Sequence, residues 1–199
     1  MHYLPLIYRS PTLQACFWAS FWAWCCLEFW VWMRERGGTR GNNRDRGSRL
    51  WIVLWVWAGI AGGFSAMWSA PAAEIGTGAR LWFSVGVVLI WLGIGLRWWA
   101  IRTLGRFFRT SVIIQGEHRM VTSGPYRWIR NPSYTGATLT MAGVGLAMLN
   151  WLSFAALLAS ILIAYARRIT VEQRALADHF GQPYRDYIAR TWALIPFVW

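Results

Sequence analysis

The longest run without a charged residue covers residues 133–166, and it limits what this chain can fold into. As one straight helix, these 34 residues would be about 50 Å long, whereas the hydrocarbon core of a bilayer is about 30 Å thick. The run must therefore fold back on itself. Asn150 and Trp151 lie near its midpoint, so we expect two short helices, at about 133–149 and 152–167, joined by a tight turn.

Three further apolar segments precede this hairpin. Residues 50–70 are the clearest span because they pass 21 positions without a charge, and a spanning helix needs about 20. Residues 13–33 are similar but carry Glu28. Residues 81–101 include Arg97, whose long side chain is expected to reach the membrane interface. The sequence therefore predicts an all-α integral membrane protein with about five transmembrane helices, the last two forming the hairpin.

The charges are bunched between these segments. Only 14% of the residues are charged while 56% are hydrophobic, and every basic residue is Arg. Residues 34–49 contain six Arg and four Gly, which predicts a flexible cytoplasmic linker. Residues 97–130 and 167–199 are also rich in Arg, whereas 71–80 contain one. The positive-inside rule then places the N-terminus outside and the C-terminus in the cytoplasm, which in a bacterium would make this an inner-membrane protein.

The net charge of +12 is explained by this topology and by contact with anionic membrane lipids. No nucleic-acid partner is expected, because the arginines flank spans rather than cover a folded basic domain. Cys16, Cys25 and Cys26 lack metal-like spacing, so we expect apolar packing and no metal. The first 14 residues lack the pattern of a cleavable signal and are expected to stay in the mature chain.

The first polar cluster is "IIQGEHRMVTSGPYRWIRNPSYTG", residues 113–136. Gly124 and Pro125 predict a turn, and Pro132 predicts a helix start with Asn131 as its N-cap. Backbone amides at such a helix start can bind a carboxylate. A capped interfacial turn whose arginines touch lipid phosphates is an equally acceptable interpretation of these residues alone.

The second cluster is "RRITVEQRALADHFGQPYRDYIARTWALIP", residues 167–196. Arg168 and Glu172 are four positions apart on a continuing helix and so share a face, which can close over the first cluster. An ordinary surface ion pair would explain these two residues as well. An amphipathic cytoplasmic stretch, broken by Gly181 and Pro183, is expected from Leu176, Phe180, Tyr184 and Tyr187.

"HRMVTSGPYRWIRNPSYTG", followed after an uncharged hairpin by "EQRALADHFGQPYRDYIARTWALIP", resembles the isoprenylcysteine carboxyl methyltransferase and phospholipid methyltransferase superfamily of membrane enzymes. The resemblance covers about 113–196, and the earlier spans match only in general character. It implies a division into N-terminal helices, 1–110, and a catalytic region, 111–199. The catalytic region would comprise a loop at 111–132, a hairpin at 133–167 and a C-terminal segment at 168–199.

The resemblance also implies S-adenosylmethionine as the cofactor, bound at the cytoplasmic ends of the last helices. Arg168 would face the methyl acceptor, and with Glu172 it forms the predicted catalytic pair. Gln115 is an added candidate for the cofactor site, since the spacing before His118 is not fixed. The implied cofactor-binding residues are Gln115, His118, Arg119, Met120, Val121, Tyr126, Asn131, Pro132, Ser133, Tyr134 and Glu172.

Methyl transfer from a sulfonium needs alignment and exclusion of water rather than a protein nucleophile. If the acceptor is a carboxylate, Arg168 can orient it through paired hydrogen bonds, with no general base needed. The "FGQPYRDY" tail resembles the carboxyl methyltransferase branch, so the resemblance favours carboxyl O-methylation of a prenylated or similarly lipophilic acceptor. Asn131 stands where the isoprenylcysteine enzymes usually show His, and Gln173 where they often show a second acid. These departures keep phospholipid N-methylation open as the alternative.

Two other classes are weighed against these methyltransferases. An NADPH-dependent membrane reductase has a similarly Arg-rich cytoplasmic face, and a noncatalytic membrane protein would need only the helices. A methyltransferase of the soluble type is not expected, because the sequence has no Gly-rich loop between a strand and a helix.

Overall fold

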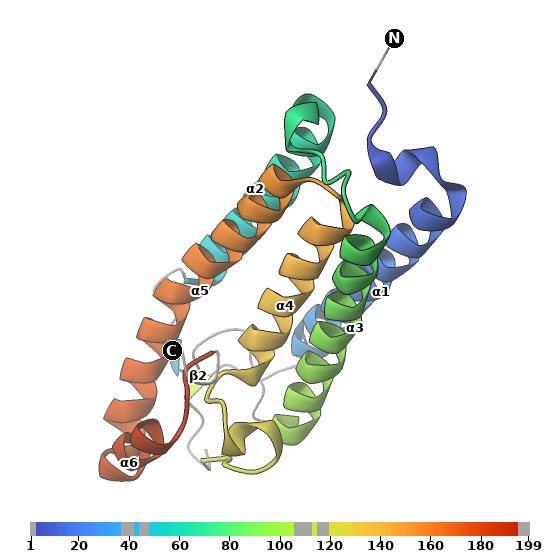
Figure 1. The fold of residues 1–199 in the computed structure, drawn as a ribbon. Helices are drawn as coiled ribbons and strands as arrows, with labels where there is room; N and C mark the ends of the chain where they lie inside the picture. The colour runs from blue at the N-terminus through green and yellow to red at the C-terminus, as the bar shows by residue number, and fades with distance from the viewer. Residues whose placement is uncertain (1–2, 37–41, 44–47, 106–112, 115–119, 195–199) are drawn as a thin grey trace.

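The computed structural model describes residues 3–36, 42–43, 48–105, 113–114 and 120–194. Five long helices form this part of the chain, and a short sixth helix follows them (Figure 1). Their bounds are α1 (Pro11–Arg36), α2 (Ser48–Ser69), α3 (Ala79–Leu104), α4 (Pro132–Ala147), α5 (Trp151–Phe180) and α6 (Gln182–Arg190). One antiparallel pair of two-residue strands, β1 (Asn42–Asn43) and β2 (Ile113–Ile114), accompanies them.

The predicted all-α membrane fold is confirmed. Among the described residues, three helices, α2, α3 and α5, are long and apolar enough to cross a bilayer. Helix α1 has 26 residues, whereas α4 has only 16, fewer than the roughly 20 that a straight span needs. The count of five spans therefore stays a prediction.

The fold-back of the long uncharged run occurs where the sequence predicts it. Asn150 occupies the N-cap of α5, and its Oδ1 accepts hydrogen bonds from the amides of Leu152 and Ser153, both at 3.0 Å. Its Nδ2 donates to the carbonyl of Ala70 at 2.9 Å. One side chain thus starts α5 and also ties the α4–α5 turn to the end of α2.

Helices α3 and α4 pack backbone against backbone (Figure 1). A Cβ added to Gly136 would lie 2.6 Å from the carbonyl oxygen of Gly93, and one added to Gly86 would lie 2.6 Å from the amide nitrogen of Ala147. Such close approach through small residues is how helices associate in lipid, where apolar side chains give no extra driving force. Helix α2 lies along α5, and α1 lies against α3.

The linker predicted at 34–49 lies mostly outside the described residues. Its first residues belong to α1, Asn42–Asn43 pairs with Ile113–Ile114, and α2 begins at Ser48. The packing predicted for the cysteines holds for Cys25, which is half-buried against the core. Cys16 and Cys26 are exposed on α1, where lipid could cover them, so apolar packing stays a prediction for these two.

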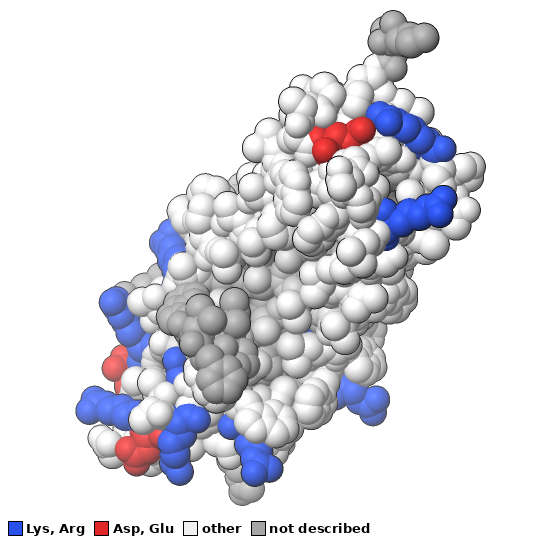
Figure 2. Space-filling view, in the orientation of Figure 1, with Lys and Arg blue, Asp and Glu red and all other residues white. Residues whose placement is uncertain are grey.

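The visible charged side chains lie toward the two ends of the molecule and leave an uncharged middle (Figure 2). Arginines are more numerous at the end that carries α6. Charge at both ends and apolar helices between them fit a protein that crosses the membrane several times.

Candidate active site

The turn that leads into α4 forms as predicted. Gly124 has a φ of 57°, which favours glycine, and Pro125 follows it in a short 3-10 turn, Gly124–Arg127. Asn131 has φ −122° and ψ 55°, outside the helical region, and Pro132 starts the helix. Asn131 is the N-cap residue of α4, as predicted, but its side chain makes no cap hydrogen bond: its Nδ2 donates to the carbonyl of Ala193 at 2.8 Å instead.

The centre of the candidate site is a contact between α4 and α5. The hydroxyl of Tyr134 donates to Oε2 of Glu172 at 2.7 Å and accepts from Nε of Arg168 at 3.1 Å. The Arg168 Nε lies 3.8 Å from the same Glu172 oxygen. The Tyr134 ring also stacks on Tyr165, with centroids 4.5 Å apart. The structure therefore brings together three residues that the sequence analysis assigned to the site.

Burial differs sharply within this cluster. The Arg168 side chain is 0% exposed, whereas the Glu172 side chain is 25% exposed. A buried cation needs a counter-charge and hydrogen-bond acceptors, and here Glu172 and the Tyr134 oxygen provide them. The charges of Arg168 and Glu172 cancel. Glu172 lies nearer to solvent, so a ligand can reach it.

The C-terminal segment packs onto the turn before α4. Trp192 and Trp128 form a backbone hydrogen bond, and the amide of Arg130 donates to the Trp192 carbonyl at 2.8 Å. Nη1 of Arg130 donates to the Ile188 carbonyl at 2.8 Å and also to the Thr191 carbonyl. Sequence reasoning missed this role of Arg130, because backbone acceptors leave no pattern in a sequence.

A second tie connects α4 to the same segment. Oγ1 of Thr135 donates to the carbonyl of Leu194 at 2.7 Å, beside the bond from Asn131 to Ala193. The side chains of Asn131 and Thr135 therefore hold the C-terminal chain along the start of α4. The closure predicted over the first polar cluster is a different contact, made by the α5 face of Arg168 and Glu172 through Tyr134.

Two tyrosines, Tyr126 and Tyr187, link the turn before α4 to α6. The hydroxyl of Tyr187 donates to the carbonyl of Tyr126 at 2.7 Å. Burial raises the pKa of Tyr126 far above its usual value, and the negative charge of Glu172 raises it further. Burial also raises the pKa of Tyr187 to about 12, although Arg130 acts in the opposite direction. Both phenols are therefore neutral near pH 7.

The backbone amides at the start of α4 are mostly committed. Pro132 has no N–H, and the amides of Tyr134 and Thr135 donate to the Asn131 carbonyl at 2.9 and 3.0 Å. Among residues 132–135, this leaves the backbone N–H of Ser133, which does not donate to the Asn131 carbonyl. We expected several backbone amides that could bind a carboxylate, and one remains.

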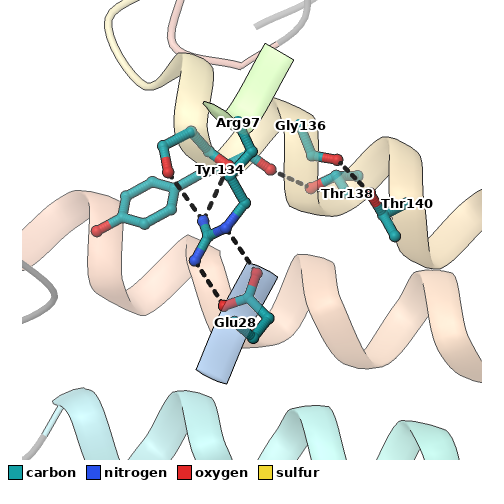
Figure 3. A network of polar contacts seen from close by, with 7 residues as sticks. Glu28, Arg97, Tyr134, Gly136, Thr138 and Thr140 are labelled. Atoms are coloured by element: carbon teal, nitrogen blue, oxygen red, sulfur yellow. Dashed lines mark hydrogen bonds and ion pairs between the residues drawn. The ribbon is translucent and has the colours of Figure 1, made fainter. Parts of the chain in front are cut away.

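A second buried network lies behind the first turn of α4 (Figure 3). Arg97 of α3 and Glu28 of α1 form an ion pair, with Nε 2.6 Å from Oε1 and Nη2 2.8 Å from Oε2. Nη1 of Arg97 donates to Oγ of Ser133 at 2.8 Å. The expectation that Arg97 reaches the membrane interface is wrong, because this partner in α1 keeps the residue buried, with 5% exposed. Two opposite charges inside apolar spans were the sequence signal for this pair.

The other predicted residues have mixed positions. Met120 and Val121 are half-buried, and Pro132 and Tyr126 are buried. Gln115, His118 and Arg119 lie outside the described residues. Their assignment to a cofactor site stays a prediction, as do the roles of the residues that are described.

Comparison with known proteins identifies relatives of this chain. A family model described as phospholipid methyltransferase matches residues 81–183, just over half of the chain. Protein-S-isoprenylcysteine O-methyltransferase B of Arabidopsis thaliana is 36% identical over 120 residues, which are 59% of this chain and 61% of the relative. Protein-S-isoprenylcysteine O-methyltransferase of Tribolium castaneum is 34% identical over 120 residues, 59% of this chain and 43% of the relative.

A solved structure is also similar. It is described as the eukaryotic intramembrane Ras methyltransferase ICMT, isoprenylcysteine carboxyl methyltransferase, without a monobody. The two chains superpose with a TM-score of 0.62 at 28% identity, over 73% of this chain and 52% of the other. This chain thus spans between about two fifths and three fifths of the relatives named here. Because the family model covers most of α3 to α5, including Tyr134, Arg168 and Glu172, the chain belongs to the phospholipid methyltransferase family.

Proposed function

We propose that this protein is a membrane-embedded methyltransferase that transfers a methyl group from S-adenosylmethionine to a lipophilic acceptor. Carboxyl O-methylation of an isoprenylcysteine is the reaction that we favour. The observation that carries this proposal is the contact of Tyr134 with Glu172 and Arg168, which lies inside the family match. The names of the relatives support the same reaction.

The residues at this contact fit the proposed cofactor. S-adenosylmethionine carries a sulfonium and an ammonium, so its site needs a negative group that a ligand can reach. Glu172 meets that requirement, because its side chain is 25% exposed and carries the only formal negative charge of the cluster. Tyr134 and Tyr126 add aromatic surface, and the Ser133 amide adds a donor. When bound, S-adenosylmethionine supplies an electrophilic methyl group.

The residues of the chain then have separate tasks. Glu172 would bind the positive groups of the cofactor, and the Ser133 amide would donate to its carboxylate. Arg168, whose guanidinium stays charged at any physiological pH, would orient an acceptor carboxylate. A carboxylate acceptor arrives deprotonated, so no general base is needed. The roles of Glu172 and Arg168 as the catalytic pair rest on this division.

The burial of Arg168 sets a condition on this mechanism. Its side chain is 0% exposed, so an acceptor carboxylate cannot touch it in the structure as it stands. The groups that cover Arg168 must shift before it can bind the acceptor. The lipophilic tail would lie among the apolar helices, and the surrounding lipids would serve as its solvent.

Phospholipid N-methylation is the second candidate. The observation that favours it is the description of the family model, phospholipid methyltransferase, which matches residues 81–183. An amine acceptor would have to lose a proton. The charged partners of Tyr134 in the described residues are Glu172 and Arg168, which are paired with each other, so this contact offers no unpaired carboxylate to take that proton.

The proposed orientation follows from the arginines. We infer that the N-terminus lies outside and that the Tyr134–Glu172 contact opens toward the cytoplasm. The larger number of arginines at the α6 end supports this orientation (Figure 2). Labelling of single introduced cysteines from either side of sealed vesicles, in a variant without the native cysteines, tests it. Labelling of the α6 end from outside would contradict it.

The activity is tested by incubating membranes that contain the protein with radiolabelled S-adenosylmethionine, using prenylated cysteine or a lipid extract as acceptor. Label in prenylated cysteine supports carboxyl methylation, and label in aminophospholipids supports the alternative. Glu172→Gln should weaken binding of S-adenosylmethionine to the purified protein. Glu74→Gln is the matched control, because Glu74 pairs with Arg9 at the other end of the helices, at 3.2 Å. Tight binding of NADPH instead, or binding of neither, would reject the proposal.

A further inference from the structure

The ion pair between Glu28 and Arg97 is costly to place inside apolar helices. Charged groups in a membrane span require a partner, and they usually mark a functional position. A buried ion pair is also weak support for stability, because apolar residues of similar size often pack at least as well. The pair therefore calls for an explanation other than holding α1 against α3.

The third partner of Arg97 provides that explanation. Nη1 of Arg97 donates to Oγ of Ser133 at 2.8 Å and to its carbonyl at 3.2 Å (Figure 3). The next residue is Tyr134, which donates to Glu172. The guanidinium thus uses one edge for the carboxylate of Glu28 and another for the first turn of α4.

Close helix packing makes this contact rigid. A Cβ added to Gly136 would lie 2.6 Å from the Gly93 carbonyl and 2.8 Å from the amide nitrogen of Arg97. The backbone and the side chain of Arg97 therefore both lie against the first turn of α4. A shift of that turn would move Tyr134 relative to α5.

We propose that Arg97, oriented by Glu28, is a positioning residue that fixes the first turn of α4 and so directs the Tyr134 hydroxyl at Glu172 and Arg168. Its effect on catalysis rests on the proposed function, whereas its effect on α4 does not. Glu28 lies outside the family match at 81–183, so α1 contributes to the site from beyond the matched region.

The first measurement is amide hydrogen exchange in the intact protein, followed at Tyr134 and Thr135. Their amides donate to Asn131, so their exchange reports opening of the first turn. Ser133→Ala removes the Arg97 bond to the hydroxyl but leaves the ion pair with Glu28 intact. We expect exchange at both amides to rise about tenfold in Ser133→Ala and Glu28→Gln, a change of about 1.4 kcal/mol in the opening equilibrium. Glu74→Gln is the control and should not change it.

Arg97→Lys separates positioning from simple neutralisation of charge. Lysine keeps the ion pair with Glu28 but lacks the planar fork that reaches two partners at once. A merely structural cation would be replaced by lysine without effect. We expect Arg97→Lys to keep the thermal stability of the wild type, yet to exchange faster at Tyr134 and to lower kcat, since misplacement by about 1 Å can cost up to about 100-fold in rate.

The outcomes separate this inference from the proposed function. If the wild type neither binds nor uses S-adenosylmethionine while exchange still rises in Ser133→Ala, the proposed function fails and the positioning contact stands. If Ser133→Ala and Arg97→Lys match the wild type in both exchange and kcat, the positioning role is overturned. Ser133→Ala retains the ion pair, so this test holds even if Glu28→Gln does not fold.

Discussion

The Tyr134 hydroxyl is the shared partner of Glu172 and Arg168, so it should couple α4 to α5 energetically. The perturbation that measures this coupling is a double-mutant cycle of Tyr134→Phe and Glu172→Ala. The phenylalanine keeps the ring that stacks on Tyr165 and removes only the hydroxyl. The cycle therefore isolates the hydrogen bond between the two side chains from their other contacts.

The size of the coupling follows from the contacts. A hydrogen bond to a charged group contributes about 1.5–3 kcal/mol. The 2.7 Å separation between Tyr134 Oη and Glu172 Oε2 is short, which favours the upper part of that range. Two effects reduce it: water reaches the Glu172 side chain, which is 25% exposed, and Arg168 at 3.8 Å can move onto the carboxylate. We therefore expect a coupling of about 1–2 kcal/mol.

The assay is reversible unfolding of the purified wild type, the two single variants and the double variant under identical conditions. The control cycle pairs Tyr187→Phe with Glu172→Ala, because the Tyr187 hydroxyl donates to the Tyr126 carbonyl rather than to Glu172. That cycle should give less than about 0.5 kcal/mol. If the Tyr134 cycle gives no more than the control, the contact does not join the helices and the candidate site loses its centre.

Three further outcomes are expected. Asn150→Ala removes both cap bonds of α5 and the bond to Ala70, so it should lower the unfolding free energy by about 2 kcal/mol in the same assay; a loss below about 0.5 kcal/mol would contradict the role of this turn. Gly136→Val should abolish the folded, monodisperse protein in size-exclusion chromatography, because even a Cβ would lie 2.6 Å from the Gly93 carbonyl; a well-folded variant would show that α3 and α4 are farther apart. The pKa of Tyr187 is raised from 10.0 to about 12, so stability linked to its neutral form is complete below pH 10 and is lost as pH rises through about 12, and Tyr187→Phe should flatten this loss in unfolding measured against pH.

The helices could be predicted because lipid imposes a simple rule on the sequence. Residues in the bilayer must satisfy their backbone groups within a helix, so the length of a mainly apolar segment locates the helices. The expected helices at 50–70 and 81–101 correspond to α2 and α3, which are long and apolar enough to span. The membrane-spanning part of the last helix was predicted to end at residue 167. The helix itself, α5, continues without a break to Phe180.

The contacts between distant segments were harder to predict, and their physical reasons differ. Asn131 was assigned as a helix cap because local chemistry favours Asn there, but a carbonyl 62 positions away takes its amide. Arg97 was placed at the interface because long side chains usually reach water, but Glu28 provides a counter-charge within the helices. Local rules give the element boundaries, whereas a buried polar side chain goes to whichever partner the tertiary fold brings near.

Asn131 also bears on the choice between the two acceptors. By the resemblance described above, Asn stands at a position where the isoprenylcysteine enzymes usually show His. In the structure this side chain donates one hydrogen bond, from Nδ2 to the Ala193 carbonyl. A neutral imidazole also has one N–H donor, so either residue can make this tie to the C-terminal segment. The departure from His therefore preserves the structural task and gives little reason to prefer an amine acceptor. The choice of acceptor depends instead on what uncovers Arg168, the buried cation that a carboxylate would need and an amine would avoid.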